Sequence, residues 1–155
     1  MMTGVDLPDE GSTAALAARI AALAKPGDII ALRGDLGAGK TSFARAFIRA
    51  CGDAREEVPS PTFTLVQIYE TDSGTIWHFD LYRLKTADEA WELGIEDAFA
   101  SGISLIEWPE RLGPLLPARR LDVTLDFGDR PQARCAFLAG HAEWPVRLAG
   151  ASIDA

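Results

Sequence analysis

The sequence has little cysteine, few basic residues and no long apolar run. Cys51 and Cys135, the two cysteines among 155 residues, lie far apart, so they indicate two small buried side chains in a reducing compartment and no disulfide framework. No apolar run approaches the roughly eighteen residues that a membrane-spanning helix needs. The opening segment, MMTGVDLPDEGS, lacks the cationic and apolar regions of a signal peptide. These absences predict a cytoplasmic protein.

Basic residues are outnumbered, since 15 Lys and Arg stand against 23 Asp and Glu for a formal net charge of −8. Nonspecific binding to a nucleic-acid backbone requires clustered Lys and Arg. The composition therefore argues against broad, direct contact with RNA or DNA. Any link to RNA is expected to run through a partner protein.

The remaining composition is that of a soluble globular protein, with 48% hydrophobic and 25% charged residues. A chain of this length is sufficient for one domain with a substantial core. It contains no internal repeat, low-complexity tract or linker. We therefore expect a single domain over residues 1–155, with a frayed tail from about residue 150.

The most informative stretch is GDLGAGKT, residues 34–41, which fits the G-x-x-x-x-G-K-[ST] pattern of a phosphate-binding loop. An apolar run, Ile29 to Leu32, precedes it, and a helical pattern begins at Lys40. The glycines allow successive backbone N–H groups to turn toward an anion, and the helix adds its N-terminal N–H groups. Lys40 is expected to reach the β- and γ-phosphates, and the Thr41 hydroxyl is expected to bind Mg²⁺.

The rest of the chain predicts an α/β protein with a mixed sheet. Two pairs of β-rich runs, 62–70 with 75–81 and 121–127 with 133–138, surround short Gly-containing turns and are typical of antiparallel hairpins. The apolar run ISLI, residues 103–106, is typical of a strand buried in a parallel sheet. Helices are expected after a cap at Ser12 or Thr13 and after a capping box at Thr86–Glu89.

Nucleotide turnover also requires an acidic group that holds the metal, usually at the end of an apolar strand. Asp80 follows Ile76–Phe79, and Glu107 follows Ile103–Ile106. The fully apolar run before Glu107 favours this residue for the central sheet. Both carboxylates could nevertheless act on one Mg²⁺, one directly and the other through water. The alternative for each is a carboxylate that faces solvent at a strand end.

A few other residues carry weaker signals. Thr62 lies between the loop helix and the Asp80 strand, a region where nucleotide switches place a hydroxyl that senses the γ-phosphate. A Thr on a β-rich run is, however, more often a strand former. Trp108 either packs in the core or lines the nucleotide pocket. His78 and His141 have no ligand-like spacing and are not predicted to bind metal.

In this order and spacing, the strings GDLGAGKT, SPTFTLV, HFDLYRL, LGIED and LIEWPE resemble the TsaE family, also called YjeE. The resemblance covers about residues 8–112 and extends more loosely to the C-terminal hairpin. It implies a small bacterial ATPase with a three-layer, P-loop NTPase-like fold and antiparallel additions to the central sheet. It also implies a role in making threonylcarbamoyladenosine at position 37 of tRNA. The TsaD and TsaB proteins are the implied partners, and ATP hydrolysis would reset the TsaD–TsaB dimer between turnovers.

Position by position, the resemblance assigns Mg²⁺ ligation to Thr41 and Glu107, and a Walker-B-like role to Asp80. Tyr82 and Arg83 belong to the same signature without an assigned role. The expected catalytic residues are Lys40, Asp80 and Glu107, and the expected metal ligands are Thr41, Asp80 and Glu107. Nucleotide contacts are expected from Leu36, Gly37, Ala38, Gly39, Lys40, Thr41, Ser42, Thr62, Trp108 and Arg130, the last on a loose match to a late arginine of the family.

Two other classes of function share the phosphate loop. A small-molecule kinase needs an acceptor pocket and usually an Arg-bearing lid, and the sequence shows no Arg-rich lid segment. A GTP-type switch usually carries the guanine-reading string N-K-x-D, and this chain contains no Asn. We therefore expect a Mg²⁺-dependent ATPase that uses ATP as substrate and is weak without its partners.

Overall fold

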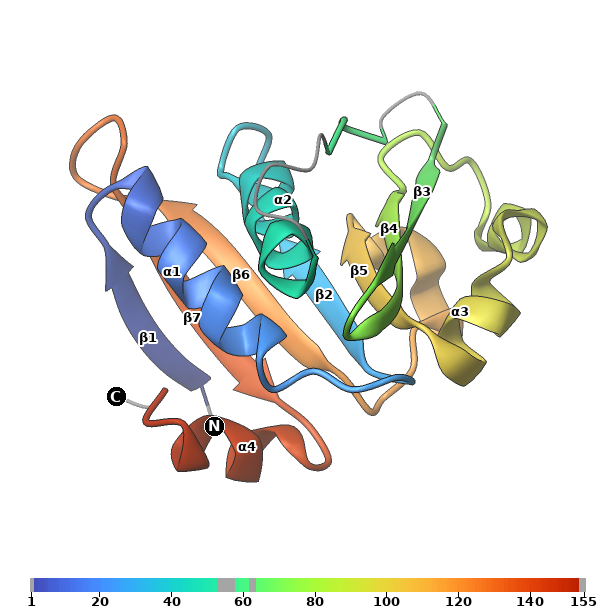
Figure 1. Ribbon diagram of the computed structural model, residues 1–155. Helices are drawn as coiled ribbons and strands as arrows, with labels where there is room; N and C mark the ends of the chain where they lie inside the picture. The colour runs from blue at the N-terminus through green and yellow to red at the C-terminus, as the bar shows by residue number, and fades with distance from the viewer. Residues whose placement is uncertain (1, 53–57, 62–63, 154–155) are drawn as a thin grey trace.

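The computed structural model describes residues 2–52, 58–61 and 64–153. They form one mixed sheet with helices on its faces (Figure 1). The strands are β1 (Met2–Leu7), β2 (Ile29–Arg33), β3 (Val66–Thr71), β4 (Gly74–Asp80), β5 (Ile103–Glu107), β6 (Leu121–Phe127) and β7 (Arg134–Gly140). The helices are α1 (Glu10–Ala21), α2 (Lys40–Cys51), the 3₁₀ segment η1 (Ala87–Leu93), α3 (Ile95–Ser101), the 3₁₀ segment η2 (Pro109–Leu115) and α4 (Trp144–Gly150).

The strand order is β1-β7-β6-β2-β5-β4-β3. β6, β2, β5 and β4 are parallel neighbours, whereas β7, β1 and β3 join by antiparallel pairing. Both predicted hairpins, β3–β4 and β6–β7, are therefore confirmed, as is the mixed α/β sheet. The inner strand of each hairpin belongs to the parallel centre, so Asp80 and Glu107 stand at the ends of neighbouring parallel strands.

Apolar side chains bury both faces of the central strands. Ile30 and Leu32 of β2 point into a core shared with α1, α2 and α4, which cover one face of the sheet. Ile29 points into a second core built with η1, α3 and η2 on the other face. A strand that is buried on both sides has to be apolar at every position, which explains the continuous run before the loop. The result is the expected three-layer arrangement (Figure 1).

The predicted start of the first helix was misplaced, whereas Thr86 is the N-cap residue of η1 as expected. Asp9, not Ser12 or Thr13, caps α1, and its carboxylate accepts hydrogen bonds of 2.8 Å from the backbone N–H and the hydroxyl of Ser12. These hydrogen bonds lower the pKa of Asp9. Thr86 forms no side-chain cap, and the segment that follows is 3₁₀ rather than α. Several Ser, Thr and Asp residues near a helix start compete for the cap, and local sequence does not decide among them.

Described residues near both ends of the chain take part in the packed structure. β1 was not predicted, because this edge strand has one buried residue, Leu7, and its sequence carries little apolar alternation. At the other end, Ile153 is 2% exposed, and its N–H donates to the carbonyl of Leu148, so the chain is packed beyond residue 150. Cys135, expected to be buried, is half-buried. No helix in the described parts of the chain is long and apolar enough to cross a membrane.

Candidate nucleotide site

The loop from Gly34 to Thr41 joins β2 to α2 at the carboxyl edge of the parallel strands. Gly34 has φ 145°, and a Cβ atom there would lie 2.6 Å from the carbonyl oxygen of Leu125, so only glycine lets the loop pass this close to β6. Gly39 has φ 109° and starts α2 without a side-chain cap. The first N–H groups of α2 are thus available to an anion, as phosphate binding requires.

Lys40 is held inside this loop. Its side chain is 5% exposed, and its Nζ donates to the carbonyl oxygens of Gly34 at 2.5 Å and Asp35 at 3.0 Å. The Nζ atom also lies 4.2 Å from the centre of the Trp108 ring. Burial lowers the pKa of Lys40, and the nearby negative charges of Glu107 and Asp80 partly offset this effect. The ammonium group is therefore placed where it would exchange two carbonyl contacts for phosphate oxygens.

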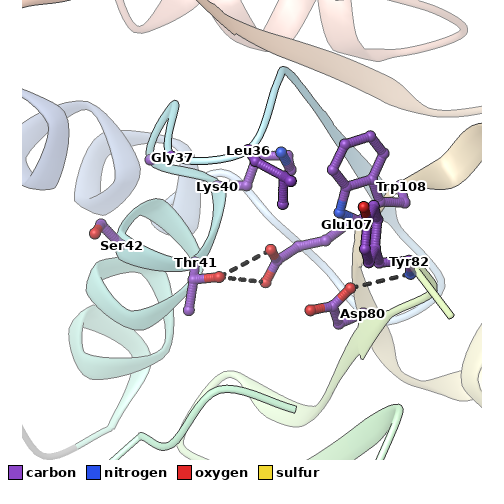
Figure 2. A pocket seen from close by; sticks show the side chains of 10 residues that line it. Leu36, Gly37, Lys40, Thr41, Ser42, Asp80, Tyr82, Glu107 and Trp108 are labelled. Carbon is purple, nitrogen blue, oxygen red and sulfur yellow. Dashed lines mark hydrogen bonds between the residues drawn. The ribbon is translucent and has the colours of Figure 1, made fainter. Parts of the chain in front are cut away.

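Asp80 and Glu107 lie side by side. They are register partners at the ends of β4 and β5, and their side chains are on the same face because parallel partners point the same way. Asp80 is 6% exposed and Glu107 is 2% exposed, so neither is a solvent-facing carboxylate. Figure 2 shows both side chains extending toward α2. The sequence did not decide which of the two carboxylates belongs to the central sheet, and the structure shows that both do.

The hydroxyl of Thr41, in the first turn of α2, meets the carboxylate of Glu107. Its Oγ1 atom donates at 2.9 Å to Oε1 and lies 3.1 Å from Oε2 (Figure 2). Asp80 is fixed separately, because its Oδ1 accepts a hydrogen bond of 3.1 Å from the backbone N–H of Tyr82. Three oxygen-bearing side chains from three separate elements thus converge beside the phosphate loop.

His78 is a member of this cluster that sequence reasoning missed. Its Nε2 atom lies 2.7 Å from Oε2 of Glu107, and the side chain is fully buried. A spacing test for metal ligands could not detect it, because His78 contacts a carboxylate rather than a metal position. The available signal was the two-residue interval between His78 and Asp80, which places both side chains on one face of a strand.

Trp108 and Tyr82 form the wall opposite the loop. Their ring centres are 4.9 Å apart, and the Lys40 ammonium group makes a cation–π contact with the face of the Trp108 ring. Trp108 has φ 60° and ψ 52°, a left-handed conformation that is uncommon for a large residue and that clusters at functional sites. Both interpretations of Trp108 hold, because it lines the cleft and also packs against the second core.

Most of the predicted site residues line one cleft of about 260 Å³. Its lining consists of Leu36, Gly37, Gly39, Lys40, Thr41, Ser42, Asp80, Tyr82, Glu107 and Trp108. Ala38 is fully buried behind the loop. Thr62 lies outside the described residues. Arg130 does not line the cleft. It lies on the exposed turn between β6 and β7.

Arg134, which was not predicted, contacts the phosphate loop instead. Its Nε donates to the carbonyl of Ala38 at 2.9 Å, and its Nη2 donates to the carbonyl of Gly37 at 3.1 Å. The third nitrogen donates to the carbonyls of Pro131 and Ala133. By holding loop carbonyls on the outer side, Arg134 favours the conformation in which the loop N–H groups turn toward the cleft.

We predict that Arg134→Ala weakens ADP binding by about ten-fold, because two hydrogen bonds to the loop are worth about 1.4 kcal/mol net. Calorimetric titration with ADP measures this change. Arg130→Ala, in the turn that leads into β7, is the matched control and should leave ADP affinity close to that of the wild type. A larger loss in Arg130→Ala than in Arg134→Ala would instead support the nucleotide contact that the sequence predicted for Arg130.

A second cavity, of about 510 Å³, continues from the cleft along the other side of the loop. It shares Gly37, Gly39 and Ser42 with the cleft and is closed by α1, α2 and the turn before β7. Its wall contains the side chains of Arg45, Arg49 and Arg134. The two cavities therefore flank the phosphate loop and share part of it as a common wall.

The donor set beside the loop suits Mg²⁺ held jointly with phosphate. Mg²⁺ prefers oxygen ligands and commonly takes one or two carboxylates together with water and phosphate oxygens. Thr41, Asp80 and Glu107 provide one hydroxyl and two carboxylates. Among the described residues there is no group of three or more His, Cys, Asp or Glu side chains that could hold a metal unaided. One hydroxyl and two carboxylates would leave the other positions of an octahedral Mg²⁺ to water and phosphate oxygens.

The sequence is similar to a known protein family and to several of its members. The model of the family described as "Threonylcarbamoyl adenosine biosynthesis protein TsaE" matches residues 7–135. The tRNA threonylcarbamoyladenosine biosynthesis protein TsaE of Rickettsia felis is 43% identical over 138 residues, which cover 88% of this chain and 80% of the relative. The protein of the same name from Bacillus subtilis is 38% identical over 133 residues, covering 85% and 81%.

A solved structure shows the same likeness in three dimensions. The crystal structure of Bacillus subtilis YdiB superimposes with a TM-score of 0.76 at 27% identity, covering 98% of this chain and 95% of that one. The region of similarity includes the phosphate loop and both paired carboxylates. The chain therefore belongs to the TsaE family.

Proposed function

We propose that this protein is a Mg²⁺-dependent ATPase that serves the biosynthesis of threonylcarbamoyladenosine in tRNA. The observation that carries the proposal is the contact between Thr41 at the start of α2 and Glu107 at the end of β5, with Asp80 beside it. A phosphate loop alone binds nucleotide, whereas hydrolysis also requires a positioned metal and an oriented water. The family relationship supports the pathway, since its relatives carry that name.

The residues divide the work by their positions. Lys40 and the N–H groups of the loop and of α2 would bind the β- and γ-phosphates. Thr41, Glu107 and Asp80 would hold Mg²⁺, which neutralises charge on the phosphates when it is bound. The buried position of both carboxylates keeps them aimed at one place, so binding requires little rearrangement of the side chains. Trp108 and Tyr82 would contact the nucleotide from the aromatic wall of the cleft.

The nucleoside end of ATP would occupy the second cavity. This cavity begins at Ser42, the residue after the proposed metal ligand Thr41, so a nucleotide with its terminal phosphates in the cleft would extend into it. Arg45 and Arg134 on its wall add positive charge next to the phosphate chain. No guanine-reading N-K-x-D string is possible in a chain without Asn, which favours adenine over guanine.

The proposed partners are the TsaD and TsaB proteins, and the proposed compartment is the cytoplasm. The family relationship supports the pathway in which these partners act. A net charge of −8 disfavours direct binding of the tRNA backbone, so contact with tRNA would be indirect, through the complex. ATP hydrolysis would then reset the TsaD–TsaB dimer between rounds of modification.

The test is steady-state hydrolysis of Mg·ATP, measured for the protein alone and after addition of purified TsaD and TsaB from the same source. We expect slow turnover alone and a clear increase with both partners, because the partner would complete the catalytic geometry. Competition between ATP and GTP is measured in the same assay, and ATP should be preferred. Tight nucleotide binding with no response to the partners would contradict the accessory role, and transfer of phosphate to a metabolite would indicate a kinase.

A further inference from the structure

His78 is placed on the metal side of the sheet by the alternation of β4. Ile76, two residues before it, points into the core shared with α2, and Asp80, two residues after it, lines the cleft. His78 must therefore point to the same side as these two residues. Because β4 and β5 are parallel with Asp80 opposite Glu107, His78 lies diagonally across from Glu107. The register thus brings an imidazole to the back of the proposed metal ligand.

The contact between His78 and Glu107 is short and shielded from water. Nε2 lies 2.7 Å from Oε2, and the two residues are 0% and 2% exposed. A carboxylate oxygen accepts, so Nε2 carries the hydrogen. The other ring nitrogen, Nδ1, is buried and has no hydrogen-bond partner among the residues that the structure describes. Within this part of the chain, the polar interaction of His78 is therefore with Glu107 alone.

This pattern does not suit a residue kept for stability. A buried polar atom without a partner costs free energy, and an apolar side chain of similar size would avoid that cost at Nδ1. The imidazole offers one thing that an apolar side chain cannot, a donor aimed at Oε2. The Thr41 hydroxyl bonds the same carboxylate from the side of the cleft, so Glu107 is fixed from both sides.

We propose that His78 is a positioning residue for the metal site, which orients the Glu107 carboxylate before Mg²⁺ and nucleotide bind. This inference rests on the proposed function, because it takes Glu107 as a metal ligand. Removal of a residue that hydrogen-bonds to a metal ligand typically weakens metal affinity by about 10–100-fold. Without its Nε2 donor, the Glu107 side chain can rotate about its own bonds and has to be reordered on each binding event.

The test compares His78→Leu, which removes the donor, with His78→Gln, whose amide nitrogen is as many bonds from Cα as Nε2. Mn²⁺, which is visible by electron paramagnetic resonance, replaces Mg²⁺, and its affinity is measured for the ADP complex without any turnover. We expect about ten-fold weaker Mn²⁺ binding in His78→Leu and nearly wild-type binding in His78→Gln. ADP affinity in EDTA should be the same in all three proteins.

Equal Mn²⁺ affinity in His78→Leu and the wild type would overturn the inference. So would a parallel loss of ADP affinity in EDTA, which would show a general structural role. If His78→Leu does not fold, His78→Asn replaces it, because its shorter amide cannot reach Oε2. Glu107→Ala is measured alongside, and unchanged Mn²⁺ binding in this variant would refute the proposed metal site itself. If Glu107→Ala loses Mn²⁺ binding and His78→Leu does not, the metal site stands and only the role of His78 is refuted.

Discussion

Lys40→Ala should weaken binding of ADP by at least about a hundred-fold. Hydrogen bonds to charged groups are worth about 1.5–3 kcal/mol each, and loss of about 3 kcal/mol corresponds to this factor. The buried position of Lys40 makes the loss larger than for a surface lysine, because water cannot replace the ammonium group easily. Calorimetric titration with ADP, with and without Mg²⁺, measures the effect.

Two further variants separate loss of charge from loss of packing. Lys40→Met keeps most of the apolar stem beside Trp108 and removes the charge, so it should bind ADP as poorly as Lys40→Ala. Lys25→Ala removes the same charge from an exposed position that lines a different cavity, and it should bind normally. ADP affinity in Lys40→Ala equal to that of the wild type would exclude the phosphate-loop assignment.

The second large effect is expected at the carboxylates. Glu107→Ala and Asp80→Ala should each lower Mg·ATP turnover by about a hundred-fold or more, since charge stabilisation by a single group in such a site is worth about 2.7–4 kcal/mol. ADP binding in EDTA should be largely retained, because the loop and Lys40 still hold the phosphates. Single-turnover hydrolysis in the presence of the partners, together with ADP titration, measures both quantities.

Glu107→Ala removes both side-chain volume and negative charge, so a further variant has to separate the two effects on turnover. Glu107→Gln keeps the volume and an acceptor for Thr41 while removing the negative charge, so it should lose turnover as Glu107→Ala does. Glu92→Gln, at an exposed position in η1, makes the same chemical change away from the cleft and should have no effect. Full Mg²⁺-dependent turnover in both the Glu107 and the Asp80 variants would refute the metal assignment.

Features carried by a few consecutive residues could be predicted from the sequence. The phosphate loop depends on glycines and a lysine within eight positions, and the structure joins them to β2 and α2 as the pattern indicates. Both hairpins followed from β-rich runs around glycine turns. The apolar run 103–106 became a strand that is buried throughout. In each case the backbone preference and the burial of neighbouring side chains agree, so local sequence is sufficient.

Local sequence could not identify the functional residue where several neighbouring residues have the same chemical capacity. It placed the α1 cap at Ser12 or Thr13, although Asp9 forms it. The resemblance matched a late arginine of the family loosely to Arg130, and it gave no sign that Arg134, four residues on, donates to the loop. The choice between such neighbours depends on which side chain the tertiary fold turns toward its partner, and that direction is not encoded in the residue type.

The contacts among the residues of the proposed metal site were decided only by the tertiary structure. Asp80 and Glu107 are distant in sequence and become neighbours because β4 and β5 pair in parallel with these residues in register. The same register brings His78 behind Glu107, and the packing of α2 on this face brings Thr41 to its front. Residue types and their spacing therefore determine which groups can bind phosphate or metal. Which of them meet is determined by strand order and register, since a shift of β4 by one residue would turn the side chains of His78 and Asp80 to the opposite face of the sheet.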